Sequence, residues 1–219
     1  MEEKRPMPHF RNSGHPLTKG DRIYAHIMLA AMMALWLPLA GCERDAPPPE
    51  PDAIDVSGEA YSNDFHLTDH NGKTVRLSDF RGKIVALFFG FTQCPDVCPT
   101  TLAAFAEVYR DLGSDADRVQ VLFVTIDPER DTQQLLAEYV PAFNARFIGL
   151  RGTPEETRRV ADMYKVSYQK IPTGGDSYTL DHTAYVFIFD RAGHLRFKVP
   201  HGQPPAALTR LIRELESDT

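Results

Sequence analysis

The sequence is short of basic residues, of cysteines and of long apolar runs. Its 24 Lys and Arg are outnumbered by 30 Asp and Glu, which gives a formal net charge of −6. Residues 1–42 hold five of the basic and three of the acidic residues, so the rest of the chain carries 19 against 27, a charge of −8. A domain with this acidic excess lacks the basic surface that nucleic acid requires, and we exclude nucleic acid as a partner.

The longest apolar run is too short for a free-standing transmembrane helix. It extends over the 15 residues Ile23–Leu37, whereas spanning a bilayer takes about 20 residues. Lys19 and Arg22 precede this run, and the small residues of Leu39–Cys42 follow it. A basic flank, a short apolar core and a small-residue site are typical of a secretory signal peptide.

Cys42, one of only three cysteines, ends this segment. Leu39–Cys42 resembles the bacterial lipobox, which implies that Cys42 is lipid-modified and becomes the mature N-terminus. The alternative is an uncleaved membrane anchor in which the cysteine is incidental. Both place the folded part outside the cytoplasm, on the periplasmic side. We therefore predict that residues 1–42 are a polar leader and lipoprotein-type signal peptide. The Pro- and acid-rich residues 43–57 are predicted to be an extended tether.

Residues 58–219 alternate strand-like and helix-like segments. Asn71-Gly72, between two short alternating runs, predicts an N-terminal β-hairpin. Buried strands are predicted at 84–91, 119–126, 184–189 and 195–199, and helices from Pro99, Thr132, Pro154 and Pro204, with Pro141 disturbing the second helix. Strands alternating with helices indicate a parallel sheet covered on both faces, and the closing strand pair adds an antiparallel edge. The predicted fold is α/β and thioredoxin-like, with a central mixed sheet flanked by helices.

Cys94 and Cys98 lie in the segment that joins the first core strand to its helix. Pro99 suits the first position of a helix, which would leave both cysteines in the preceding loop. A helix N-terminus favours a thiolate and so improves a cysteine both as a nucleophile and as a metal ligand. A structural disulfide here would close a very small loop and stabilise little. The spacing alone leaves metal binding and thiol exchange open.

His182 is the candidate for a third ligand, because it immediately precedes the strand predicted at 184–189. In a thioredoxin-like sheet that strand lies beside the first core strand, so its leading loop meets the cysteine segment. Thioredoxin-like oxidoreductases usually have a proline directly before this strand; here Thr183 takes that place and Pro172 is well upstream. Two thiolates and an imidazole suit copper, with zinc as the rival. The alternative for His182 is an ordinary surface or hydrogen-bonded histidine.

Three motifs together resemble the Sco/SenC family. They are Phe91–Pro99 (FTQCPDVCP), Asp127–Thr132 (DPERDT) and Asp181–Thr183 (DHT), the last followed by Asp190 and Gly193. The resemblance covers essentially the whole domain, although the family usually has Ser where Thr183 stands.

The resemblance implies a membrane-anchored, thioredoxin-like protein that binds one copper ion through Cys94, Cys98 and His182. It further implies that the protein delivers copper to the dinuclear copper centre of cytochrome c oxidase, or reduces the cysteines of that centre.

Several other polar residues could belong to such a site. Asp127, Pro128 and Arg130 follow the strand predicted at 119–126 and so lie near the cysteine segment, where they could tune metal affinity, dock a partner or form only a local ion pair. Asp96 is interpreted as solvated. Four further histidines are expected at the surface without a metal role: His66, His70, His194 and His201. Met163 is the only methionine of the domain and is expected in the core, so a methionine-rich site is not indicated.

These residues are consistent with three alternative functions. The first is a copper chaperone that uses Cys94, Cys98 and His182 and passes its ion to a copper-bearing oxidase subunit or another copper carrier. The second is a thiol-disulfide oxidoreductase in which Cys94 attacks and Cys98 resolves. The third is a zinc-stabilised binding module, which is disfavoured because structural zinc prefers a fourth ligand and the sequence offers no obvious one.

Overall fold

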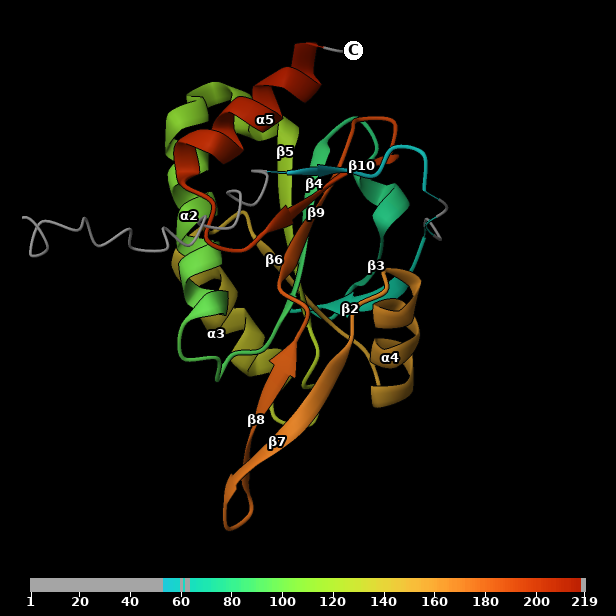
Figure 1. Cartoon of the computed structure of the whole chain (residues 1–219), viewed down its shortest axis with the longest axis vertical. Helices are drawn as coiled ribbons and strands as arrows, with labels where there is room; N and C mark the ends of the chain where they lie inside the picture. The colour runs from blue at the N-terminus through green and yellow to red at the C-terminus, as the bar shows by residue number, and fades with distance from the viewer. Residues whose placement is uncertain (1–52, 60, 62–63, 218–219) are drawn as a thin grey trace, which may run out of the picture. The chain divides into compact units, whose positions relative to one another are not determined.

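A computed structural model of the chain describes residues 53–59, 61 and 64–217 (Figure 1). The predicted leader, the signal peptide with Cys42, and most of the tether lie outside the described residues, so they remain predictions. Within the described part of the chain, no helix is both long and apolar enough to cross a membrane.

The core is an eight-stranded mixed sheet with the order β1-β10-β9-β4-β5-β6-β2-β3. A second sheet consists of β7 and β8 alone. The strands are β1 (Ile54–Asp55), β2 (His66–Asp69), β3 (Thr74–Arg76), β4 (Ile84–Gly90), β5 (Val119–Thr125), β6 (Ile148–Arg151), β7 (Tyr168–Gly174), β8 (Ser177–His182), β9 (Tyr185–Phe189) and β10 (Leu195–Pro200).

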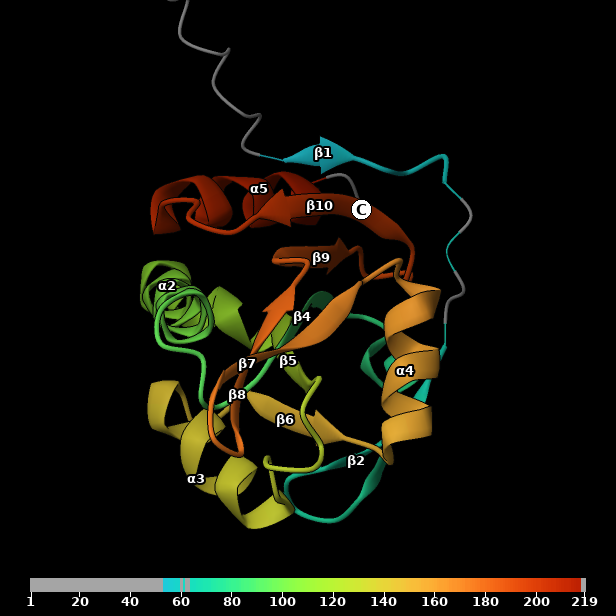
Figure 2. The ribbon, with the colours of Figure 1, turned by 60° about the horizontal axis from the view of Figure 1, so that its bottom comes forward.

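The two central strands, β4 and β5, are buried at every position. They are parallel, with Ile84 opposite Val119, and they are apolar on both sides because helices cover both faces of the sheet. Figure 2 shows α2 and α3 on one face and α4 on the other. The helices are η1 (Leu77–Phe80), α2 (Val97–Leu112), η2 (Gly113–Arg118), α3 (Gln133–Phe143), α4 (Pro154–Met163) and α5 (Pro205–Ser217).

The arrangement confirms the predicted α/β, thioredoxin-like fold. β2 and β3 form the hairpin around Asn71-Gly72, where Gly72 has a φ of +85° that favours glycine. β9 lies beside β4 and is antiparallel to it, and β10 continues the antiparallel edge. Met163 is partly buried against the core, as expected.

One helix boundary predicted from proline was wrong. Helix α2 begins at Val97, with Asp96 as its N-cap, rather than at Pro99. Proline is tolerated one turn into a helix because the first backbone N–H groups have no intrahelical partner. Pro141 does not interrupt α3, which continues to Phe143. It lies close to the C-terminal end of the helix, so few of the helical hydrogen bonds are affected.

Four strands were not predicted. β6 is only four residues long and contains Gly149, where a Cβ would lie 3.0 Å from Val140 Cγ2. β7 is exposed from its second residue onward, so it has no alternating apolar pattern, and it forms a hairpin with β8. β1 lies within the segment assigned to the tether: it pairs with β10, and the following Val56 is only 3% exposed. The fold therefore includes residues that precede residue 58.

Val56 gives a direct test of this earlier start. Val56→Ala should lower the free energy of unfolding by about 1.5 kcal/mol, since each buried methyl-sized group contributes roughly 0.8 kcal/mol. Ile54→Ala removes more carbon from the same segment but should cost less, because Ile54 is 36% exposed. Urea denaturation of the two variants measures the difference. Equal stability of Val56→Ala and wild type would contradict the assignment of this segment to the fold.

Candidate metal centre

Cys94 and Cys98 are held by the turn that leads from β4 into α2. Cys94 is half-buried in the loop, and Cys98, the second residue of α2, is fully buried. The backbone N–H of Cys98 donates to Cys94 Sγ at 3.4 Å. The start of α2 thus supplies a donor to the first sulfur, and the earlier start of the helix places Cys98 inside its first turn.

Gly90, the last residue of β4, makes room for the buried sulfur. A Cβ at this position would lie 2.7 Å from Cys98 Sγ and 2.8 Å from Phe123 Cε2. Contacts shorter than 3.0 Å are not tolerated without displacement, so any side chain here would push Cys98 out of place. The requirement for glycine is steric.

His182 ends β8 and faces the cysteines with one ring nitrogen. Its Nδ1 lies 3.0 Å from the carbonyl oxygen of Thr183. A carbonyl can only accept, so Nδ1 carries the proton and the lone pair is on Nε2. The rings of Phe88 and Phe91 lie edge-on to the imidazole, with centroids 6.4 and 5.9 Å away. These contacts fix both the tautomer and the orientation that a metal ligand needs.

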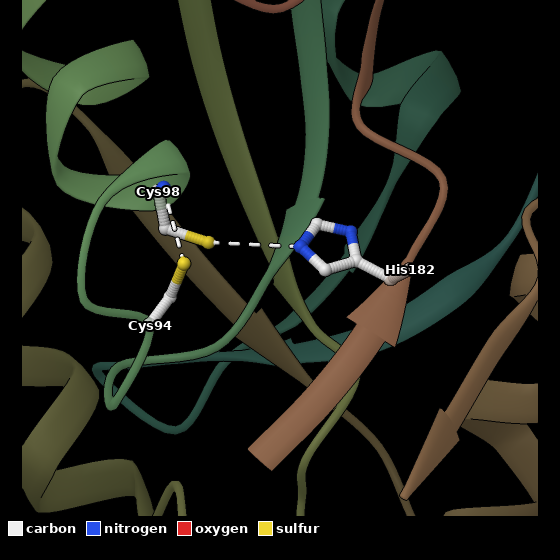
Figure 3. Close-up of side chains that lie close together, drawn as sticks. All are labelled: Cys94, Cys98 and His182. Atoms are coloured by element: carbon white, nitrogen blue, oxygen red, sulfur yellow. Dashed lines mark hydrogen bonds between the residues drawn. The ribbon is translucent and has the colours of Figure 1, made fainter. Parts of the chain in front are cut away.

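Figure 3 shows the three side chains converging from two segments of the chain. Cys98 Sγ and His182 Nε2 are 4.0 Å apart, and the ligand atoms of Cys94, Cys98 and His182 all lie within 4.8 Å of one another. Among the described residues, these form the only group of three or more His, Cys, Asp or Glu with this geometry. The predicted meeting of His182 with the cysteine segment is confirmed; metal ligation by the three residues remains a prediction.

The donor set fits a soft metal ion. Two thiolates and an imidazole match the preference of Cu(I), and imidazole also suits Cu(II). Structural zinc sites are almost always closed by a fourth protein ligand, and within the described chain no fourth such group joins the cluster. The zinc-stabilised module therefore fits the site less well than copper does.

The two cysteines differ sharply in acidity. The Cys98 thiol hydrogen-bonds to Cys94 and lowers the pKa of Cys94 to about 5; burial opposes this shift, and backbone N–H groups of Asp96 and Cys98 assist it. The same side-chain contact, together with burial, raises the pKa of Cys98 well above its usual range. At neutral pH the reduced pair therefore consists of a partly buried Cys94 thiolate and a fully buried Cys98 thiol.

Asp131 lies beneath the cysteine loop and was not singled out in the sequence. It is fully buried, and its carboxylate accepts the Thr92 N–H at 3.1 Å and the hydroxyls of Thr92 and Thr125, both at 2.6 Å. Burial raises the pKa of Asp131 and these hydrogen bonds oppose the shift. Its presence in the motif Asp127–Thr132 was the available signal. It anchors the start of the cysteine loop to the end of β5.

The other candidate residues do not join the ligand group. Asp96 is exposed, as are His66, His194 and His201. His70 differs from the prediction of a surface histidine: it is partly buried, and its Nδ1 accepts the Gly149 N–H at 2.9 Å. A side chain that closes a backbone hydrogen bond has a structural role.

Asp127 and Arg130 lie beside the cysteine loop, as predicted. They form an ion pair in which Asp127 is buried and Arg130 is largely buried. Arg130 also donates to Gln93 Oε1 at 3.2 Å and to the Tyr178 carbonyl at 2.7 Å. Gln93 and Tyr178 are contacts that the sequence did not reveal, because β7 and β8 were not predicted.

The domain thus belongs to the class of thioredoxin-like proteins that carry a Cys–Cys–His candidate metal site. Comparison with known proteins identifies its family. The SCO1/SenC family model matches residues 55–217, so the chain belongs to the SCO1/SenC family. The SCO2-like protein of Rickettsia felis is 37% identical over 132 residues, which are 59% of this chain and 64% of that protein. The mitochondrial SCO2 homolog of Bos taurus is 41% identical over 133 residues, 59% of this chain and 50% of that protein. The chain thus spans half to somewhat under two thirds of these relatives.

Solved structures agree with the family. The copper-bound ScoI of Bradyrhizobium japonicum is 39% identical, with a TM-score of 0.66, and the match covers 72% of this chain and 99% of that one. Copper-bound yeast Sco1 is 28% identical, with a TM-score of 0.67 and coverage of 74% and 91%. Relatives of this fold therefore hold copper.

The acidity of Cys94 can be measured by alkylation. In a Cys42→Ser background, the rate at which reduced protein reacts with iodoacetamide should rise through a midpoint near pH 5 and be level by neutral pH, because the thiolate is the nucleophile. Cys98→Ala removes the thiol that is the largest cause of the shift, so the midpoint should move upward. A wild-type midpoint near the ordinary thiol value of about 8.5 would contradict the assignment.

Gly90→Ala tests the steric requirement beneath Cys98. The added methyl should displace the sulfur and weaken metal binding by about tenfold or more, as changes in the support of a ligand do. Gly58→Ala is the matched control, because a Cβ there meets nothing within 4 Å and the residue has no positive φ. Competition with a Cu(I) chelator gives the affinities. Equal affinity of Gly90→Ala and the control would show that the sulfur position is not constrained.

Proposed function

We propose that this chain is an extracytoplasmic copper chaperone that holds one copper ion through Cys94 Sγ, Cys98 Sγ and His182 Nε2. The observation that carries the proposal is the convergence of these three atoms within 4.8 Å, although the two segments are 84 residues apart. Membership of the SCO1/SenC family and the copper-bound relatives support it.

The proposed role is delivery of copper to the dinuclear copper centre of cytochrome c oxidase, or reduction of the cysteines of that centre before loading. The partner would be the copper-bearing oxidase subunit or another copper carrier. Three protein ligands leave room for a partner's sulfur, so copper can pass by stepwise ligand exchange without being released to solvent. The lipid anchor at Cys42 belongs to this proposal, as does the tether from residue 43, because both keep the site at the membrane where the oxidase resides.

A second candidate, thiol-disulfide oxidoreductase, is favoured by one observation. Cys94 is a partly buried thiolate at neutral pH and Cys98 is a buried thiol beside it. Cys94 would attack a partner disulfide and release one partner thiolate. Cys98 would then lose its proton and displace the second thiol, leaving a Cys94–Cys98 disulfide and a partner reduced by two electrons. His182 has no role in this scheme.

Copper binding separates the two candidates. The reduced full-length chain carrying Cys42→Ser, in detergent and without oxygen, should bind one Cu(I) tightly, and Cu(II) should give a thiolate-to-copper charge-transfer band. His182→Ala removes a ligand, so it should weaken binding by at least the roughly 10–100-fold that loss of an outer-shell partner costs, and it should alter the band. Absorption spectra and chelator competition measure both effects.

His66→Ala is the matched control, because His66 is exposed and outside the cluster. Unchanged stoichiometry and affinity in His182→Ala would overturn the assigned ligand set. Absence of copper binding together with rapid turnover of a disulfide substrate would move the protein to the oxidoreductase class.

A further inference from the structure

The hairpin that carries His182 has little apolar support of its own. β7 and β8 form a separate two-stranded sheet that projects from the rest of the fold (Figure 1). β7 is exposed from Gln169 to Gly174, and Leu180 is the only buried residue of β8. Since few buried contacts hold the hairpin, its position depends on the polar contacts along its length.

At the base of the hairpin Tyr168 packs partly buried against the core, and the polar contacts at the base and the outer edge involve exposed or partly exposed groups. Ser167 and Thr183 are joined at the base by bonds of 3.0 and 3.2 Å. Lys170 pairs with Glu129 at 2.7 Å, with both side chains about half exposed. An exposed ion pair of this kind stabilises by little, and the Ser167–Thr183 bonds lie at the base of the hairpin. Neither contact therefore fixes how the middle of the hairpin lies against the cysteine loop.

Arg130 connects the middle of the hairpin to the cysteine loop. Its Nε donates to the buried carboxylate of Asp127, and its Nη1 donates both to Gln93 Oε1, next to Cys94, and to the carbonyl oxygen of Tyr178, on the hairpin. One guanidinium thus contacts the end of the second core strand, the cysteine loop and the strand that ends at His182. Its side chain is only 19% exposed, so solvent weakens its bonds to Asp127 and to the Tyr178 carbonyl less than it weakens the Lys170 pair.

The Tyr178 side chain completes the contact from the hairpin. Arg130 Cζ lies 3.7 Å from the centre of the Tyr178 ring, within the range of a cation–π interaction. The Tyr178 hydroxyl donates to Asp127 Oδ1 at 2.8 Å, on the other oxygen of the carboxylate that Arg130 holds. Tyr178 is four residues before His182 on the same strand. The three side chains form a closed set, which we call the Asp127–Arg130–Tyr178 clamp.

We propose that Arg130 is a positioning residue for the metal site: through this clamp it sets the distance between His182 Nε2 and the two cysteine sulfurs. It touches none of the three ligand atoms itself. A planar guanidinium with several fixed donors can bridge the three segments at once, whereas the single ammonium of lysine cannot. The proposal deepens the proposed function and rests on it where metal affinity is concerned.

The test is a double-mutant cycle with a second readout on metal-free protein. Arg130→Gln should lower Cu(I) affinity by about 10–100-fold in the Cys42→Ser chain, but by less than about twofold when His182→Ala is also present, because the clamp acts through His182. Arg130→Lys should not restore the affinity. In the metal-free protein, backbone amides of β8 should exchange with D₂O faster in Arg130→Gln than in wild type, while β4 and β5 remain unchanged.

Two further variants keep the interpretation clear. Arg130→Gln leaves the buried Asp127 carboxylate without its cation, so Tyr178→Leu is tested beside it: this change removes the ring but keeps the ion pair, and it should shift both readouts in the same direction by less. Arg146→Gln is the matched control, because Arg146 also combines an ion pair, with Asp117, and a tyrosine ring, of Tyr109. It should leave copper affinity and β8 exchange unchanged.

The outcomes separate the proposal from the function on which it rests. An equal loss of affinity from Arg130→Gln with and without His182 would overturn it, because Arg130 would then act on the cysteines or on overall stability. Unchanged β8 exchange in Arg130→Gln would also overturn it. If wild type binds no copper, the proposed function fails, but the exchange of the metal-free protein still decides whether Arg130 holds the hairpin.

Discussion

The pairing of β4 with β9 is the constraint on which the site depends. The two strands are antiparallel, so the end of β4 lies beside the start of β9. The cysteine loop follows the end of β4, and His182 lies just before the start of β9. Residues distant in sequence therefore meet where β4 ends and β9 begins, at one end of these neighbouring strands. Backbone hydrogen bonds join β4, which is buried throughout, to β9, which is buried after its first residue, so the site rests on one of the most protected parts of the fold.

The residues around the site differ in burial: those on the side of Cys98 are buried, and those on the side of Cys94 are partly exposed. The rings of Phe88 and Phe91 flank the imidazole, and Cys98 is sealed between Gly90 and the first turn of α2. Cys94 faces the half-exposed loop. Near it, each carboxylate oxygen of the buried Asp127 and Asp131 accepts at least one hydrogen bond, as buried acids require. These hydrogen bonds of Asp127 and Asp131 hold the loop and the hairpin, and neither carboxylate is bonded to one of the three ligand atoms.

The sequence predicted the parts of this arrangement that strong periodic patterns determine. The runs at 84–91 and 184–189 were apolar enough to be placed in the core, and their neighbourhood brought His182 to Cys94 and Cys98. It did not predict β7 and β8, because an exposed hairpin with Pro172 and Gly174 carries no apolar alternation. The bridge from Arg130 to Gln93 and Tyr178 was hidden for the same reason. β1 and β6 were too short to be distinguished from loops, and the start of α2 was misplaced because proline is accepted throughout a first helical turn.

The unequal burial of Cys94 and Cys98 sets an order in which the two sulfurs would exchange a bound ion. A thiol arriving from another protein would meet Cys94 before Cys98, because Cys94 is only partly buried and Cys98 is fully buried. An ion held between them would therefore change hands in a fixed sequence, with the outer sulfur replaced first and the inner one last. Loading would follow the reverse sequence, with the inner sulfur acting as the final anchor. A chain in which both sulfurs were equally exposed would have no such order, and its cargo could be lost from either side.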